Sequence, residues 1–206
     1  EYVDPQGQKR AIPPTLLISS LGIVPDIRQV VTMDAKQAGD LVYIVGETRA
    51  ELGGSLYYRL HGGLGNTVPA PVPDAIETMR ALHRAIRAGL VRACHDLSEG
   101  GLAVAAAEMA FAGRLGMDLA LAALPRAANV DRDDVVLFSE SSARFLVEVA
   151  PEHTTAFEAA LAGRPVARLG CVTGDGMLHV RGLAGDTVIA CPIADLLRST
   201  SPTCRY

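Results

Sequence analysis

Short apolar runs separated by turn residues dominate the hydrophobic pattern of the chain and predict a sheet. Residues 15–24 (TLLISSLGIV) and 41–46 (LVYIVG) are nearly continuous apolar runs, which is typical of buried strands. Apolar residues alternate with others at Phe145, Val147 and Val149, which also predicts a strand. Further strands are expected at residues 91–95, 117–121, 166–172, 177–180 and 187–190, and the alternating strand is expected to span residues 143–150.

Two longer segments have the period of helices. Asp74 is a candidate N-cap for a helix that runs to about Ala88 and ends at Gly89. The second helix, residues 102–112, is apolar nearly all round except for Glu108, so we expect it to be buried. The apolar face of the first helix consists of Ile76, Met79, Leu82, Ala85 and Ile86.

Two shorter helices are expected at the Tyr57-Tyr58 pair and from Pro151 to about Leu161. Strands and helices are thus mixed, and the chain contains neither heptads nor an internal repeat. The predicted fold class is α+β, with a mixed or antiparallel sheet covered by helices, rather than a doubly wound nucleotide-binding fold. We expect a leading segment at residues 1–14, a single domain at residues 15–198 and a tail at residues 199–206.

Charge and composition argue against several classes of partner and site. The net charge of −4 provides no basic surface, so nucleic acid is not an expected partner. No apolar run approaches the roughly 18 residues that a membrane-spanning helix needs. The cysteines have neither the C-x-x-C spacing nor the nearby histidines of a zinc site, which favours structural thiols and a cytoplasmic location. The first residues are polar and lack a methionine, so we interpret them as a fragment boundary.

The turn between the strand at residues 91–95 and the buried helix is a candidate phosphate site. Ser98, Glu99, Gly100 and Gly101 form it, and glycines allow a ligand to approach the backbone closely. The unpaired N–H groups and the helix dipole at such a point favour a phosphate or a carboxylate. Ser98 is a candidate N-cap or a donor to that anion. The alternative is an ordinary capped turn between a strand and a helix.

A second candidate loop precedes the strand at residues 143–150. Ser139, Glu140 and Ser141 offer hydroxyl and amide donors for a phosphate or ribose, and Arg144 has the geometry for a bidentate phosphate contact. The alternative is a solvated turn with Arg144 on an exposed strand face.

Carboxylates and a cysteine complete the set of candidates. Asp96, at a strand end, is a candidate magnesium ligand, since Mg²⁺ usually takes one or two carboxylates together with substrate phosphates. For Glu108 a structural hydrogen bond or ion pair is favoured over a ligand role, because burying it unpaired would be costly. Cys94 is not expected to be a nucleophile, because neighbouring residues on a strand point to opposite faces.

The string DLSEGGLAVAAAEMAFAG, residues 96–113, resembles a signature of phosphoribosylformylglycinamidine synthases. These belong to the superfamily of aminoimidazole ribonucleotide synthetase. Residues 2–34, the ELGGS segment with its tyrosine pair, and LFSESSARFLVEV resemble further segments of the same family in the same order. The resemblance covers roughly residues 1–149. Several relatives have a glycine between the Ser-Glu-Ser and the arginine, where this chain has Ser142 and Ala143.

The resemblance implies the C-terminal domain type of that superfamily and a specific reaction. The family converts formylglycinamide ribonucleotide into formylglycinamidine ribonucleotide with ATP, magnesium and ammonia derived from glutamine, in purine biosynthesis. The implied partners are missing N-terminal domains of the same enzyme and, in a short-type enzyme, a glutaminase subunit and a small accessory subunit. We expect the isolated chain to be inactive. The rival hypotheses are another ATP-dependent enzyme of the superfamily and a non-catalytic binding domain with the same fold.

Overall fold

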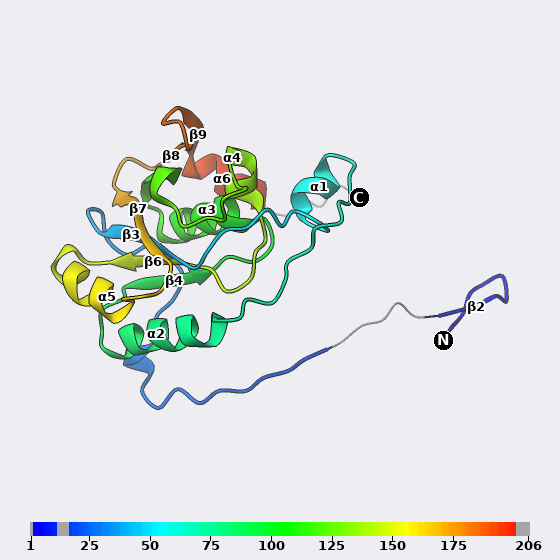
Figure 1. Cartoon of the computed structure of the whole chain (residues 1–206), viewed down its shortest axis with the longest axis horizontal. Coiled ribbons are helices and arrows are strands. Elements are labelled where there is room, and N and C mark those ends of the chain that lie inside the picture. Colours follow the sequence, from blue (N-terminus) through cyan, green and yellow to red (C-terminus); the bar gives the residue numbers. More distant parts are fainter. Residues whose placement is uncertain (1, 12–16, 201–206) are drawn as a thin grey trace. The chain divides into compact units, whose positions relative to one another are not determined.

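The structure, a computed structural model, describes residues 2–11 and 17–200 (Figure 1). The chain forms two units, Glu1–Val30 and Val31–Tyr206. The first unit contains a short hairpin of β1 (Tyr2–Val3) and β2 (Lys9–Arg10), followed by the 3-10 helix η1 (Ile27–Gln29). The carboxylate of Asp4 stabilises the hairpin, because it accepts hydrogen bonds from the backbone of Gln6 and Gln8 and from the side chain of Arg10.

The prediction of a strand at residues 15–24 is wrong for residues 17–24, the part of that range that the structure describes. Residues 17–24 form neither helix nor strand, and Leu21 is 98% exposed. Residues 15 and 16 lie outside the described residues. An apolar run gives a strand only where a neighbouring strand pairs with it, and no strand of the described chain pairs with this one.

The second unit is built on a seven-stranded sheet with the order β4-β6-β3-β7-β5-β8-β9. Neighbouring strands are antiparallel except for the parallel pair β5–β8. The prediction of a mixed, largely antiparallel sheet is therefore confirmed. The strands are β3 (Leu41–Val45), β4 (Ala93–Asp96), β5 (Gly116–Ala120), β6 (Phe145–Val149), β7 (Val166–Thr173), β8 (Met177–Arg181) and β9 (Thr187–Pro192).

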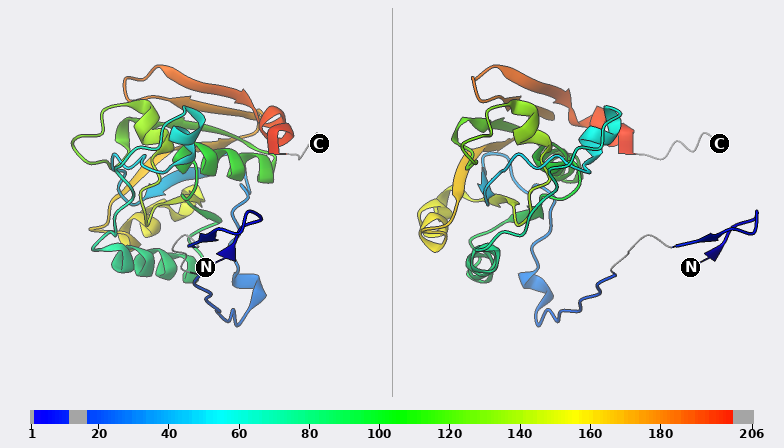
Figure 2. Two further views of the ribbon diagram at one scale, coloured as in Figure 1. Left: turned by 90° about the vertical axis from the view of Figure 1, so that its right-hand side faces the viewer. Right: turned by 45° about the vertical axis from the view of Figure 1, so that its right-hand side comes forward.

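Helices cover both faces of this sheet (Figure 2). On one face lies α3 (Gly101–Gly113), which contacts both α4 (Asp133–Phe138) and α6 (Ile193–Thr200). On the other face α2 (Ala75–Arg87) packs with α5 (Thr154–Ala160). The remaining helices are α1 (Leu56–Leu60) and the 3-10 helices η2 (Leu121–Ala123) and η3 (Pro151–His153).

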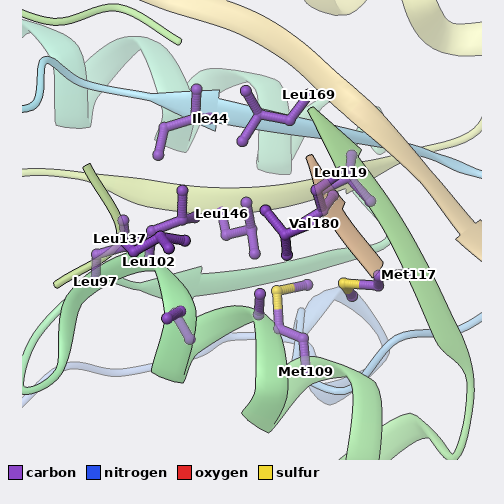
Figure 3. Close-up of a cluster of buried hydrophobic side chains, with 14 of the residues drawn as sticks. Ile44, Leu97, Leu102, Met109, Met117, Leu119, Leu137, Leu146, Leu169 and Val180 are labelled. Atoms are coloured by element: carbon purple, nitrogen blue, oxygen red, sulfur yellow. The ribbon is translucent and has the colours of Figure 1, made fainter. Parts of the chain in front are cut away.

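Burial on two faces explains the continuous apolar run of β3. Val42 and Ile44 belong to the core beneath α3, whereas Tyr43 and Val45 belong to the core with α2 and α5. Successive side chains of a strand point to opposite faces, so a strand covered on both sides must be apolar throughout. Figure 3 shows the first of these cores, with Ile44 on the sheet and Met109 on α3.

The structure contains the two longer helices that the sequence predicts, but some residues of α2 are not buried as predicted. As expected, α3 is buried along most of its length. Asp74 occupies the N-cap position of α2, but its side chain makes no capping hydrogen bond. Ile76 and Met79, predicted to lie on the apolar face of α2, are 59% and 42% exposed, because Thr78 and Ala81 take the buried positions of the first two turns.

Candidate functional site

The turn before α3 depends on its two glycines. Gly100 and Gly101 have φ angles of 78° and 64°, in the left-handed region that side chains disfavour. A Cβ atom on Gly101 would lie 2.4 Å from the carbonyl oxygen of Ser139, and one on Gly100 would lie 2.3 Å from Cγ2 of Val104. The turn and the Ser139–Ser141 loop therefore pack backbone to backbone, which brings the two predicted site segments together.

Glu140 joins this turn to a third segment. Its Oε1 accepts hydrogen bonds from the backbone N–H of Gly100 at 2.9 Å and of Leu56 at 3.2 Å. Gly100 is the N-cap of α3 and Leu56 is the first residue of α1. The carboxylate thus lies at two helix N-termini, where the peptide dipoles stabilise a negative charge.

Further amides at the start of α3 remain available. The N–H of Gly101 bonds to the carbonyl of Ser98, whereas those of Leu102 and Ala103 have no acceptor among the described residues. Unpaired amides are normal in the first turn of a helix and form a ready site for an anion.

The serines of the second loop are fully buried and bonded within the protein. Ser139 Oγ donates to the carbonyl of Arg49 at 2.6 Å, and Ser141 Oγ accepts from the N–H of Arg49 at 3.0 Å. The two hydroxyl oxygens lie 3.1 Å apart. The pair therefore fixes the loop to the segment that follows β3.

Arg144 holds the same loop from inside. It is 1% exposed, and it donates to the carbonyl oxygens of Ser141 and Ser139 and to the hydroxyl of Thr48. Burial lowers the pKa of its guanidinium to about 10, while nearby Glu51 and Glu140 favour the charged form. The sequence suggested a phosphate-facing or a surface-exposed arginine; the guanidinium instead faces the acceptors of its own loop.

The exposed part of the site consists of Asp96, Ser98 and Glu99. Ser98 is not the N-cap of α3, since Gly100 takes that position in a left-handed conformation. The Ser98 hydroxyl has no partner among the described residues and remains available as a donor.

The Asp96 carboxylate is 68% exposed and lies 3.4 Å from Nδ1 of His95. Among the described residues no group of three or more His, Cys, Asp or Glu side chains could hold a metal ion. Asp96 can therefore supply one oxygen to Mg²⁺, whose other ligands would have to be water, phosphate oxygens or another domain.

Two neighbouring predictions can be assessed directly. The expected structural role of Glu108 is confirmed, because its Oε2 lies 2.8 Å from Nε2 of His95. Burial raises the pKa of the Cys94 thiol to about 12, so the thiol stays protonated and is a poor nucleophile. Cys94, Cys171 and Cys191 are free thiols.

Glu51 was not among the residues predicted for the site. It is 5% exposed; its Oε1 accepts from the N–H of Ala70 at 3.0 Å, while its Oε2 is buried without a hydrogen-bond partner among the described residues. Its negative charge favours the charged form of the buried Arg144 guanidinium. The signal in the sequence was an acidic residue directly before the Leu-Gly-Gly-Ser turn.

Comparison with known proteins assigns a family to this arrangement. The family described as AIR synthase related protein, C-terminal domain, matches residues 37–182. The chain is 37% identical over 175 residues to the phosphoribosylformylglycinamidine synthase subunit PurL of Alkaliphilus metalliredigens (strain QYMF), which covers 82% of this chain and 23% of that protein.

Solved structures show the same fold. Thermotoga maritima PurL complexed with FGAR aligns with a TM-score of 0.71 at 23% identity, over 82% of this chain and 30% of that one. Its complex with ATP aligns with a TM-score of 0.66 at 22% identity, over 82% and 27% of the two chains. The chain thus spans less than a third of the length of these relatives. Among the described residues, no helix is long and apolar enough to cross a membrane.

Proposed function

Since the chain belongs to the family of AIR synthase related proteins, as their C-terminal domain, we propose that it is one domain of a phosphoribosylformylglycinamidine synthase. The whole enzyme would be an ATP-dependent ligase that forms a carbon–nitrogen bond in purine biosynthesis. Its substrate would be formylglycinamide ribonucleotide, and glutamine would supply the nitrogen. The 37% identity to a PurL subunit supports this choice over the other enzymes of the superfamily.

The chemistry of that reaction fits a domain that positions phosphates. ATP would phosphorylate the amide oxygen of the substrate, and ammonia would then displace phosphate from the activated carbon. Such a reaction depends mainly on orienting the reactants and on stabilising phosphate charge. The residues of this chain would bind and orient, whereas the remaining domains would supply most of the ATP and magnesium site.

The observation that carries the proposal is the hydrogen-bonded junction around Glu140. The Gly100–Gly101 turn, the Ser139–Ser141 loop and the start of α1 are held together by the two bonds that Oε1 of Glu140 accepts. The unpaired amides of Leu102 and Ala103 and the hydroxyl of Ser98 would donate to a phosphate there. Arg144, Ser139 and Ser141 would act by holding the loop in place, and Glu99 would lie at the rim.

The cofactors and partners follow from the same proposal. ATP and Mg²⁺ would be shared with an N-terminal-type domain, with Asp96 as one magnesium ligand. A glutaminase subunit and a small accessory subunit would deliver ammonia in a short-type enzyme; one solved structure of a relative is that of PurLQS from Thermotoga maritima. The enzyme would work in the cytoplasm, and this chain alone would not turn over.

Isothermal titration of the chain with formylglycinamide ribonucleotide, and separately with magnesium ATP, tests the proposal. We expect Ser98→Ala to weaken the binding of a phosphate-bearing ligand by about 10- to 100-fold, the effect of one lost hydrogen bond to a charged group. Thr187→Ala removes an exposed hydroxyl at the start of β9 and serves as the matched control. Equal affinities of the two variants would show that this turn is not a phosphate site.

A further inference from the structure

Two carboxyl groups lie inside the second unit, away from the candidate phosphate turn. Asp40, directly before β3, is 1% exposed, and Glu148, on β6, is fully buried. In the sheet Glu148 lies opposite Val42 of β3 and Ala93 of β4, which both belong to the core beneath α3. Residues that lie opposite each other share a face of the sheet, so the Glu148 side chain points toward that apolar core.

Glu148 holds the segment that leads into β3. Its Oε2 accepts a hydrogen bond from the backbone N–H of Lys36 at 2.9 Å, and its Oε1 accepts one from that of Gln37 at 3.0 Å. The preceding N–H, of Ala35, donates to the carbonyl of Met109 on α3. This segment is the beginning of the second unit. Two of its amides therefore depend on a single carboxyl group.

Asp40 lacks the donors that a buried carboxylate needs. Neither of its oxygens accepts a hydrogen bond from the described residues. Nε of Arg92 lies 3.1 Å from Oδ2 and forms an ion pair with it. The terminal nitrogens of Arg92 donate elsewhere, to the side chains of Gln37 and Glu152. Leaving such an acceptor unsatisfied is costly, so a donor is expected beside Asp40.

A proton between the two carboxyl groups supplies that donor. The Asp40 and Glu148 side chains are within hydrogen-bonding contact of each other, which requires that one of them is protonated. Burial, reinforced by Asp40, raises the pKa of Glu148 to about 7, although the N–H groups of Lys36 and Gln37 favour its charged form. The proton also removes one of two buried negative charges, which Arg92 alone would otherwise have to balance.

The other charged groups around the pair keep their charge in this pH range. Arg92 stays positive, since a guanidinium does not lose its proton in a protein. Glu152 stays negative, because its own backbone and Arg92 hold its pKa below the ordinary 4.5. On the segment itself, the ammonium of Lys36 pairs with Asp34 rather than with the buried carboxyl groups. The buried pair is therefore the group whose charge changes.

We propose that Asp40 and Glu148 share one proton and that this proton is a latch for the segment that leads into β3. With the proton bound, the pair carries one negative charge, Arg92 balances it, and Glu148 keeps its two backbone donors. When the proton leaves to solvent, the two carboxylates repel each other, and Glu148 releases the amides of Lys36 and Gln37. The inference is independent of the proposed synthase function, because none of these residues is assigned to it.

The sign of the effect follows from the raised pKa. The latched state binds the proton more tightly than the open state, in which Glu148 has its ordinary value of 4.5. The latch is therefore complete below pH 4.5 and is lost as the pH rises through about 7.

Hydrogen exchange of the Lys36 and Gln37 amides in the 206-residue chain, measured against pH, tests the proposal. After correction for the intrinsic exchange rate, their protection should fall about 10-fold or more between pH 4.5 and about 8. Local opening exposes little surface, so low concentrations of urea should not change this exchange. Exchange at Ile44, on the interior strand β3, should instead increase with urea.

Asp40→Asn keeps the shape of the side chain and provides a permanent N–H donor for Glu148. Protection of Lys36 and Gln37 should then no longer depend on pH. Asp186→Asn, which makes the same change at an exposed residue between β8 and β9, is the matched control and should keep the pH dependence. In the unmodified chain the ¹³C signal of the Glu148 carboxyl group reports the proton itself and should titrate over the same range as the protection.

Three results would each overturn the latch. The first is a pH dependence of the protection that persists in Asp40→Asn. The second is a Glu148 carboxyl signal that titrates while the protection of the two amides stays constant. The third is exchange at Lys36 and Gln37 with the same urea dependence as at Ile44, because the amides would then open only when the whole unit unfolds. The last two need only the unmodified chain, so they decide the question even where Asp40→Asn does not fold.

Discussion

Oε1 of Glu140 lies 2.9 Å from the backbone nitrogen of Gly100, and through this bond the Ser-Glu-Ser loop supplies a negative charge to the start of α3. The same oxygen accepts from Leu56 at the start of α1. One side chain therefore completes the N-termini of two helices, since it satisfies a backbone donor at each of them.

Glu140→Ala should lower the free energy of unfolding by about 1–3 kcal/mol, because two backbone donors lose their acceptor. Glu140→Gln keeps an acceptor oxygen and should cost less, about 0.5–1 kcal/mol for the lost charge at the helix ends. Urea unfolding followed by circular dichroism measures both. Glu99→Ala, an exposed neighbour in the turn, is the control; an equal loss in all three variants would contradict the bridging role.

Gly101→Ala should be strongly destabilising, by about 3 kcal/mol or more, because the new Cβ would lie 2.4 Å from a backbone oxygen that cannot move away freely. Gly89→Ala separates this clash from backbone strain alone. Gly89 has a φ of 71°, and a Cβ atom added there would meet no atom within 4 Å, so the cost should be about 1 kcal/mol. Thermal unfolding compares the two, and similar melting temperatures would argue against the close packing of turn and loop.

Ala143→Gly should stabilise the chain by up to about 1 kcal/mol. Ala143 has a φ of 58°, a conformation that costs a residue with a side chain roughly 1–2 kcal/mol and glycine almost nothing. A glycine at this position would adopt the same backbone angle without strain. Ala88→Gly, at a negative φ of −81°, should instead leave stability unchanged or lower it. A melting temperature for Ala143→Gly below that of the unmodified chain would refute the strain.

Glu148 should make stability fall as the pH rises. Burial, opposed by the N–H groups of Lys36 and Gln37 and reinforced by neighbouring Asp40, raises the pKa of Glu148 from 4.5 to about 7. The folded state then binds a proton more tightly than the unfolded state, so the stabilisation is complete below pH 4.5 and is lost as the pH rises through about 7. Allowing for screening, we expect on the order of 1–2 kcal/mol from this group.

Glu148→Gln should remove this part of the pH dependence, whereas Glu77→Gln, in an exposed pair with Arg80, should keep it. Urea unfolding at several pH values between 4.5 and about 8 measures the slope. An unchanged slope in Glu148→Gln would assign the dependence to other groups.

By itself the sequence determined the fold class, most of the regular elements and the family. The apolar run Leu41–Val45 and the apolar helix α3 could be placed from the sequence, because a strand or helix that is apolar all round must be covered on all sides. The short helices α4 and α6 were missed, since a few residues carry too little periodicity to distinguish a helix from a turn.

Only the tertiary structure decided what the polar residues do. Arg144 is buried against the carbonyls of its own loop, Glu140 bridges two helices, and Gly101 is required by the oxygen of Ser139. The apolar residues 17–24 lie exposed in the described part of the chain. The outcomes for Glu140 and Gly101 depend on partners far away in the sequence, which the order of residues along the chain does not reveal.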